Sequence, residues 1–166
     1  MLIGLPKEII DNESRVGLTP ESVKKLISQG HEILVETDAG FGSGFSDGDY
    51  IHLGARIVKK PKEVFENAEL IIKVKEPQSA EVNLLKPDQL LFTYLHLAAN
   101  KNLTQGLMDS QSTCIAYETV TSSSNSLPLL APMSEVAGKI SIQAGARALE
   151  KTCLLYTSPS PRDNKA

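Results

Sequence analysis

Short, densely apolar runs alternate along the chain with segments whose apolar residues recur at helical spacing. The runs at 70–74 and 90–95 are almost continuously apolar, which is typical of parallel strands buried on both faces. Repeated strand–helix alternation predicts an α/β fold in which helices cover both faces of a parallel sheet. The predicted strands lie at 2–5, 33–35, 56–58, 70–74, 90–95 and 113–116.

Helix-start signals punctuate the segments between these strands. Thr19 and Pro20 predict the start of the first helix, because threonine caps well and proline suits the first helical position, and Gly30 ends it. A longer helix is predicted from Pro132 to about Lys151, where apolar residues recur at helical spacing. Shorter helices are expected from Asp47, over 61–67, within 79–85 and around 103–108.

Residues 152–166 break this pattern. Their sequence, TCLLYTSPSPRDNKA, is rich in Ser and Pro and predicts a disordered tail. Within it, CLLYTSPSPRD resembles the translation of a sequencing-library adapter, so we interpret the tail as an assembly artefact and exclude it from fold reasoning. A natural Ser/Pro-rich tail is the alternative. In the first case the natural protein continues beyond Lys151.

Length and charge narrow the class of protein. A chain of 166 residues suits one domain, or one domain with an additional arm. A net charge of −3 and a pI near 5.6 argue against nucleic-acid binding, which needs a basic surface. No apolar run approaches the roughly 20 residues of a membrane span, and no signal peptide is evident, so we expect a cytoplasmic protein. Two cysteines make no disulfide framework, and no metal site is expected.

Four polar residues follow predicted strands or begin a helix, where ligands bind in open α/β sheets. Arg15 lies in the loop after the first strand, Lys75 and His96 follow the two most apolar strands, and Ser134 is near the start of the last helix. Arginine binds carboxylates in a two-pronged fashion, lysine can polarise a carbonyl oxygen, and histidine transfers protons near neutral pH. Together they suit a small anionic carbonyl compound.

Each of these residues also has a purely structural interpretation. Arg15 can be a solvated loop charge, Lys75 can cap a strand end, and a lone histidine after a strand is more often structural than catalytic. The glycine-rich segment from Gly40 to Gly44 follows a strand, as a dinucleotide fingerprint would, but Phe45 occupies the place of the third glycine. We therefore interpret this segment as a structural turn.

Six segments between Met1 and about Lys151 carry a specific family resemblance. They are GLPKEIIDNESRVGLTP, GHEILVETDAGFGSGFSD, IIKVKEPQ, LFTYLHLA, AYETV and LPLLAPMSEVAGK. With these segments the chain resembles bacterial alanine dehydrogenases, of the alanine dehydrogenase/nicotinamide nucleotide transhydrogenase family. This resemblance implies NAD-dependent interconversion of L-alanine with pyruvate and ammonia, two Rossmann-like domains with a cleft between them, and a homohexamer.

The resemblance also implies a role for each candidate residue. Arg15 in NESRV would bind the substrate carboxylate, and Lys75 in KVKEP would hold and polarise the carbonyl or imine. His96 in TYLHL would be the general acid/base. In APMSEVAG, Met133 would line the substrate pocket and Ser134 would contact the cofactor.

The family pattern predicts the domain organisation as well. Residues 1–131 would form an incomplete substrate-binding domain, and 132–151 a connector helix towards an NAD domain that follows Lys151. We therefore expect the chain alone to be inactive. Two alternatives remain: the N-terminal part of a transhydrogenase alpha subunit, whose members generally lack the counterparts of Lys75 and His96, or a non-catalytic small-molecule binding module.

Overall fold

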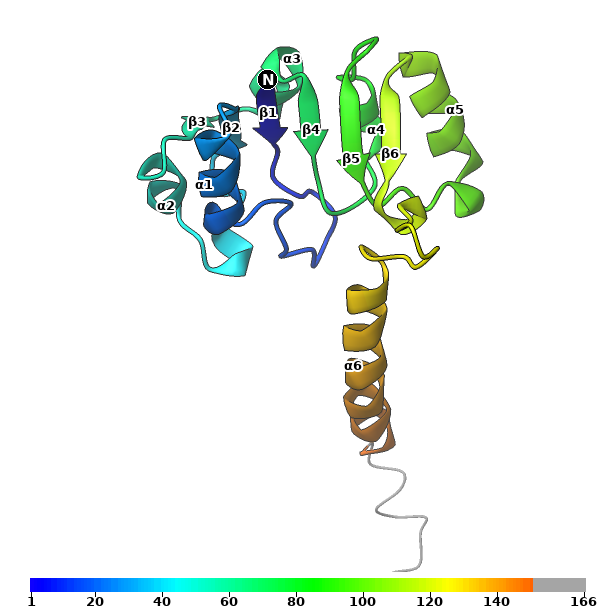
Figure 1. Cartoon of the computed structure of the whole chain (residues 1–166). Helices are drawn as coiled ribbons and strands as arrows, with labels where there is room; N and C mark the ends of the chain where they lie inside the picture. Colours follow the sequence, from blue (N-terminus) through cyan, green and yellow to red (C-terminus); the bar gives the residue numbers. More distant parts are fainter. Residues whose placement is uncertain (151–166) are drawn as a thin grey trace, which may run out of the picture. The chain divides into compact units, whose positions relative to one another are not determined.

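A computed structural model describes residues 1–150, which divide between two compact units, Met1–Val120 and a second unit that begins at Thr121. The first unit holds a six-stranded parallel sheet with the order β3-β2-β1-β4-β5-β6 (Figure 1). The chain reverses its direction of travel across the sheet between β1 and β4, which is where Rossmann-like folds place their ligands. The strands are β1 (Leu2–Leu5), β2 (Glu32–Glu36), β3 (Arg56–Val58), β4 (Leu70–Ile72), β5 (Leu90–Thr93) and β6 (Thr113–Ala116).

Helices cover both faces of the sheet, as the alternation predicts. Ile3 and Leu5 of β1 pack into one apolar core, whereas the intervening Gly4 faces Val64 and Ala68 of the other, because successive strand residues point to opposite faces. The first core includes residues of α1 and α2, and the second includes residues of α3 and α5. The helices are α1 (Pro20–Ser28), α2 (Asp47–Ile51), α3 (Pro61–Asn67), α4 (Ser79–Val82), α5 (Lys101–Ser110) and α6 (Ala131–Leu149).

The predicted helix signals are confirmed at α1. The Thr19 side chain accepts a hydrogen bond from the Ser22 N–H at 3.3 Å, and Pro20 is the first helical residue. The helix ends at Ser28, before Gly30, which has a left-handed φ of 85°. Glycine adopts this conformation without steric cost, so the position suits the turn into β2.

Two strands end earlier than the apolar runs predict. β4 ends at Ile72 rather than at residue 74, and β5 ends at Thr93 rather than at residue 95. Side-chain carboxylates replace the next strand as hydrogen-bond acceptors: Glu8 accepts from the Val74 N–H, and Glu118 accepts from the Leu95 N–H. Hydropathy alone predicts burial at these positions but does not reveal the change of partner.

The glycine-rich segment forms a structural turn. Residues Phe41–Ser43 make a short 3-10 helix, and Gly44 follows with a φ of 84°. A β-carbon at Gly40 would lie 2.8 Å from the Tyr50 ring, so glycine is needed there for close packing. These roles account for the glycines without a bound phosphate.

The second unit contains α6, which confirms the predicted long final helix and begins at Ala131, one residue earlier than expected. The domain boundary at residue 131 and the connector role of this helix stay predictions. The predicted tail at 152–166 lies outside the described residues. Within residues 1–150, no helix is both long and apolar enough to span a membrane.

Gly4 provides a test of the packing between β1 and the second core. A β-carbon at this position would lie 2.7 Å from both Ala68 Cβ and Val64 Cγ1. We expect Gly4→Ala to lower the free energy of unfolding by about 1–3 kcal/mol, as overpacked cores usually do. Urea denaturation measures the change. Gly138→Ala is the control, since a β-carbon there meets nothing within 4 Å and no loss is expected. Equal stability of Gly4→Ala and the parent would contradict the packing argument.

Candidate functional site

The candidate site lies at the carboxyl edge of the sheet, around the switch point between β1 and β4. Arg15 belongs to the loop after β1, Lys75 follows β4, and His96 follows β5. The carboxyl ends of parallel neighbouring strands lie at one edge of the sheet, which is why residues distant in sequence meet there. Three of the four sequence-predicted polar residues therefore belong to neighbouring loops of the first unit.

Arg15 is paired with a carboxylate from its own loop. Its Nε and Nη2 donate to Glu13 Oε1 and Oε2 at 2.8 and 2.6 Å, and the Arg15 N–H also donates to Glu13 Oε1 at 2.9 Å. These hydrogen bonds lower the pKa of Glu13 and raise that of Arg15. The positive charge of Lys75 lowers the pKa of Glu13 further, so the lysine acts on the same carboxylate. Arg15 nevertheless keeps a half-exposed side chain.

The backbone of Lys75 is held on both sides. Its N–H donates to Glu8 Oε1 at 3.4 Å, and its carbonyl accepts from the Thr93 hydroxyl at 2.8 Å. Thr93 is fully buried at the end of β5, and Glu8 comes from the loop after β1. The backbone at Lys75 is therefore fixed by Thr93 at the end of β5 and by Glu8 in the loop after β1.

His96 adopts an uncommon backbone conformation, with a φ of 49°. A left-handed φ is unfavourable for a residue with a β-carbon, so the surrounding structure must stabilise it. Glu118 does so by accepting the His96 N–H at 2.7 Å and the Leu95 N–H at 3.0 Å. Burial raises the pKa of Glu118, but these backbone hydrogen bonds outweigh burial and the net pKa is lowered.

The imidazole of His96 has its own partners. Nδ1 lies 3.2 Å from Glu76 Oε2, and the ring stacks on Tyr94 with centroids 6.1 Å apart. When Nδ1 carries the ring proton, it donates a hydrogen bond to Glu76. Nε2 is then the nitrogen that can accept a proton and later release it. A carboxylate that orients a histidine in this way is common in proton-transfer sites. Tyr94 in turn packs edge-to-face on Tyr117, whose pKa burial raises strongly.

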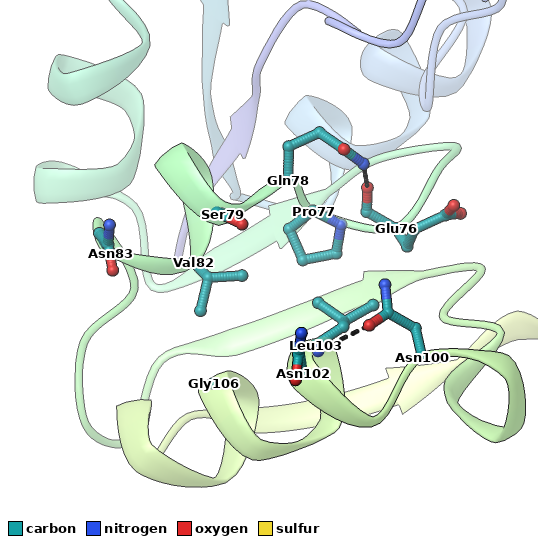
Figure 2. A pocket seen from close by; sticks show the side chains of 10 residues that line it. All are labelled: Glu76, Pro77, Gln78, Ser79, Val82, Asn83, Asn100, Asn102, Leu103 and Gly106. Carbon is teal, nitrogen blue, oxygen red and sulfur yellow. Dashed lines mark hydrogen bonds between the residues drawn. The ribbon is translucent and has the colours of Figure 1, made fainter.

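Hollows adjoin these residues. One of about 170 Å³ is lined by Glu13 and Arg15, and an apolar one of about 380 Å³ is lined by His96 and Leu97. A polar cleft of about 420 Å³ between α4 and α5 lies beside the site and shares only Glu76 with it (Figure 2). In Figure 2 the Gln78 side-chain amide donates a hydrogen bond to the Glu76 backbone carbonyl, so these two polar groups of the cleft wall are paired with each other.

The glycine-rich segment does not have the form of a dinucleotide-binding loop. The glycine-rich segment has Phe45 in place of the third glycine, and it folds into the 3-10 turn described above. Within residues 1–150, no three His, Cys, Asp or Glu side chains gather in a way that would hold a metal ion.

The remaining predicted residues, Met133 and Ser134, lie in the first turns of α6 in the second unit. The Ser134 N–H is used within the helix, where it donates to the Leu130 carbonyl at 3.1 Å. Their predicted roles stay predictions.

Sequence reasoning missed the acidic partners of the site. Glu13 lies two residues before Arg15 and Glu76 directly follows Lys75, so opposite charge nearby in sequence was an available signal. Glu76, however, pairs with His96 rather than with Lys75. Glu8 and Glu118 gave no local signal, because they bind backbone that is distant in sequence.

Comparison with known proteins gives consistent matches. Residues 4–137 match the family model for the alanine dehydrogenase/PNT N-terminal domain. An alanine dehydrogenase of Halomonas elongata is 54% identical over 151 residues, which cover 91% of this chain and 41% of that protein. The alanine dehydrogenase of Bacillus subtilis is 55% identical over 151 residues, with 91% and 39% covered. The chain thus spans about two fifths of the length of these curated relatives.

Solved structures agree. An L-alanine dehydrogenase superimposes with a TM-score of 0.86 at 54% identity, over 91% of this chain and 42% of that one. A transhydrogenase from Sinorhizobium meliloti gives a TM-score of 0.67 at 30% identity, over 71% of this chain and 35% of that one. The resemblance and the Rossmann-like parallel fold predicted from the sequence are confirmed.

Glu36, beside the site, provides a pH test. It is buried at the end of β2 and accepts the Lys7 N–H at 2.9 Å, and burial raises its pKa above 4.5. An acid whose pKa is raised on folding destabilises the fold as pH rises through that pKa. Glu36→Gln keeps the acceptor, so we expect its stability relative to the parent to increase from pH 4.5 to pH 7 in thermal unfolding.

The control for this experiment is Glu32→Gln, which makes the same substitution at an exposed position of the same strand. A stability difference between Glu36→Gln and the parent that changes with pH no more than that of the control would contradict the assignment.

Proposed function

Because the chain belongs to the alanine dehydrogenase/PNT N-terminal domain family, we propose that it is the substrate-binding part of an NAD-dependent L-alanine dehydrogenase. Such an enzyme interconverts L-alanine and water with pyruvate and ammonia, using NAD as the hydride acceptor. The observation that carries the proposal is the grouping of Arg15, Lys75 and His96 on neighbouring loops at the switch point of the sheet.

The alternative functions have less support. The transhydrogenase match has 30% identity against 54–55% for the alanine dehydrogenases. A non-catalytic binding module would need neither an oriented histidine nor a lysine near the carboxylate site, whereas His96 pairs with Glu76 at 3.2 Å. These observations favour the dehydrogenase over both alternatives.

Arg15 is proposed to bind the substrate carboxylate. Its guanidinium offers five N–H donors, and Glu13 takes two of its nitrogens in the structure. A substrate carboxylate would share the guanidinium with Glu13 or displace it. Each charge-assisted hydrogen bond of this type contributes about 1.5–3 kcal/mol, so exchange of one carboxylate for another is nearly balanced. This balance favours reversible binding of a small anion.

Lys75 and His96 are proposed to act on the oxygen and nitrogen atoms bonded to the reacting carbon of the substrate. In the direction of alanine formation, ammonia adds to the pyruvate carbonyl, and the resulting hydroxyl group leaves as water once it has received a proton. A lysine ammonium stabilises the developing charge on oxygen. An imidazole oriented by a carboxylate supplies the proton and recovers one from the nitrogen, which is ordinary general acid–base chemistry.

The cofactor and assembly proposals rest on the family. The main NAD-binding residues would lie outside 1–150, because the glycine-rich segment within the described residues does not fit a dinucleotide. Ser134 is proposed to contact the cofactor and Met133 to line the pocket. We further propose a cytoplasmic homohexamer, which is the assembly that the family resemblance implies.

The acid–base role of His96 can be tested by joining residues 1–151 to the remaining part of a related alanine dehydrogenase. We expect His96→Ala to lower kcat by roughly 10²–10⁴-fold, the usual contribution of a general acid–base group. Steady-state oxidation of L-alanine, followed by NADH absorbance, measures the change. His52→Ala is the control, since His52 is an exposed residue at the end of α2. Unchanged turnover in His96→Ala would exclude the assignment.

Arg15 and Lys75 should separate in their kinetic effects in the same chimaera. The substrate carboxylate keeps its charge throughout the reaction, so Arg15→Ala should raise KM with a smaller effect on kcat. The charge that Lys75 is proposed to stabilise develops during the reaction, so Lys75→Ala should lower kcat and raise KM. If Lys75→Ala abolished turnover while His96→Ala kept it, the proton-transfer role would move to Lys75.

A further inference from the structure

A buried charge network lies directly beneath the candidate site. The Lys73 side chain is fully buried, and those of Glu8 and Glu81 are only 3% and 5% exposed. Lys73 Nζ lies 2.7 Å from Glu81 Oε1 and 3.2 Å from Glu8 Oε2. The network thus joins the loop after β1, the end of β4 and the helix α4.

The second oxygen of each carboxylate binds backbone. Glu8 Oε1 accepts the Val74 N–H at 2.6 Å and the Lys75 N–H at 3.4 Å. Glu81 Oε2 accepts the Gln78 N–H at 2.8 Å and so caps α4. The ammonium therefore fixes two carboxylates, and each carboxylate fixes one end of the turn from β4 to α4. Lys75 lies within that turn.

Glu8 takes the place of a missing strand. β1 ends at Leu5, so beyond Ile72 the chain that follows β4 has no β1 backbone beside it. On the opposite side the ladder continues, because the Lys73 N–H donates to the Phe92 carbonyl and the Tyr94 N–H donates to the Val74 carbonyl. The Glu8 carboxylate supplies the acceptor that β1 no longer provides.

Stability alone is a poor reason for such a network. Burying two carboxylates and one ammonium is costly, and well-packed apolar residues of similar volume often stabilise a fold as well or better. What an apolar replacement lacks is an acceptor for the Val74 and Lys75 N–H groups. We propose that Glu8, held by Lys73, is a positioning residue that fixes the backbone at Lys75 and thereby aims the Lys75 side chain at the substrate. This inference rests on the proposed substrate-binding role of Lys75.

Glu8→Gln and Glu81→Gln form a matched pair for the test. Each removes one carboxylate from the same ammonium, but only Glu8 touches the backbone beside Lys75. The side-chain oxygen of a glutamine at position 8 can accept from either Lys73 or the backbone. Its NH₂ group then faces the other donor, and that hydrogen bond is lost. In the 166-residue chain, NMR-detected exchange of the Val74 and Lys75 amides should accelerate at least 10-fold in Glu8→Gln. In Glu81→Gln it should stay within 3-fold of the parent.

Pyruvate affinity gives the functional readout on the same samples. Titration followed by NMR should show at least a 10-fold weaker Kd for Glu8→Gln and less than a 3-fold change for Glu81→Gln. Equal effects of the two variants on amide exchange or on Kd would mean that the network only stabilises the fold, and would overturn the proposal. Absence of pyruvate binding by the parent would instead overturn the proposed function, and the exchange data would still decide whether Glu8 holds Lys75.

A neutral background keeps the test decisive if Glu8→Gln does not fold. In a Lys73→Met, Glu81→Gln chain, no ammonium competes for the side chain at position 8. Glu8→Gln in this background retains an acceptor for the Val74 and Lys75 N–H groups, whereas Glu8→Met has nearly the same shape and retains none. We expect parent-like exchange and pyruvate affinity for the glutamine variant, and loss of both for the methionine variant. Identical behaviour of the two would overturn the proposal.

Discussion

Carboxylates that accept backbone N–H groups where strands end are the interaction on which the candidate site depends. Glu36 at the end of β2 accepts the Lys7 N–H as the chain leaves β1. Glu8, in that same loop, accepts the Val74 N–H as the chain leaves β4. Glu118 accepts the Leu95 and His96 N–H groups as the chain leaves β5. Each exit is thus anchored by a side chain from a neighbouring strand or its following loop.

These anchors explain why the site can be rigid although its residues lie in loops. Loops lack the repeated backbone pairing of a sheet, and precise sites need groups held by a second layer of hydrogen bonds. A carboxylate accepts hydrogen bonds from several N–H groups at once, and a neighbouring anion repels it. Both effects restrict where the carboxylate can lie. The cost is electrostatic: burial raises the pKa of Glu36, and Lys73 is needed to compensate Glu8 and Glu81.

Features that depend on residues close in sequence could be predicted, whereas those that depend on distant residues could not. Thr19 and Pro20 act within one helical turn, so the sequence predicts the start of α1. The apolar runs predict β4 and β5, because the composition of each run indicates that it is buried. The anchors depend on strand order instead. Glu8 and Val74 are 66 residues apart and meet only because β1 and β4 are neighbours in the sheet. Position after a strand singled out Arg15, Lys75 and His96, and the family resemblance assigned their predicted roles, but neither revealed what holds them.

Two side chains of the site have carboxylate partners within the first unit. Glu13 pairs with the Arg15 guanidinium, and Glu76 lies beside the His96 ring. An unpaired arginine at the edge of a sheet would bind any anion, whereas a paired one binds only an anion that offers more than Glu13 does. Under the proposed roles, a substrate whose carboxylate reaches Arg15 while its carbonyl reaches Lys75 would meet this condition, because it would gain two interactions for the one that it displaces. The acidic residues beside the site would then contribute to selectivity as well as to position.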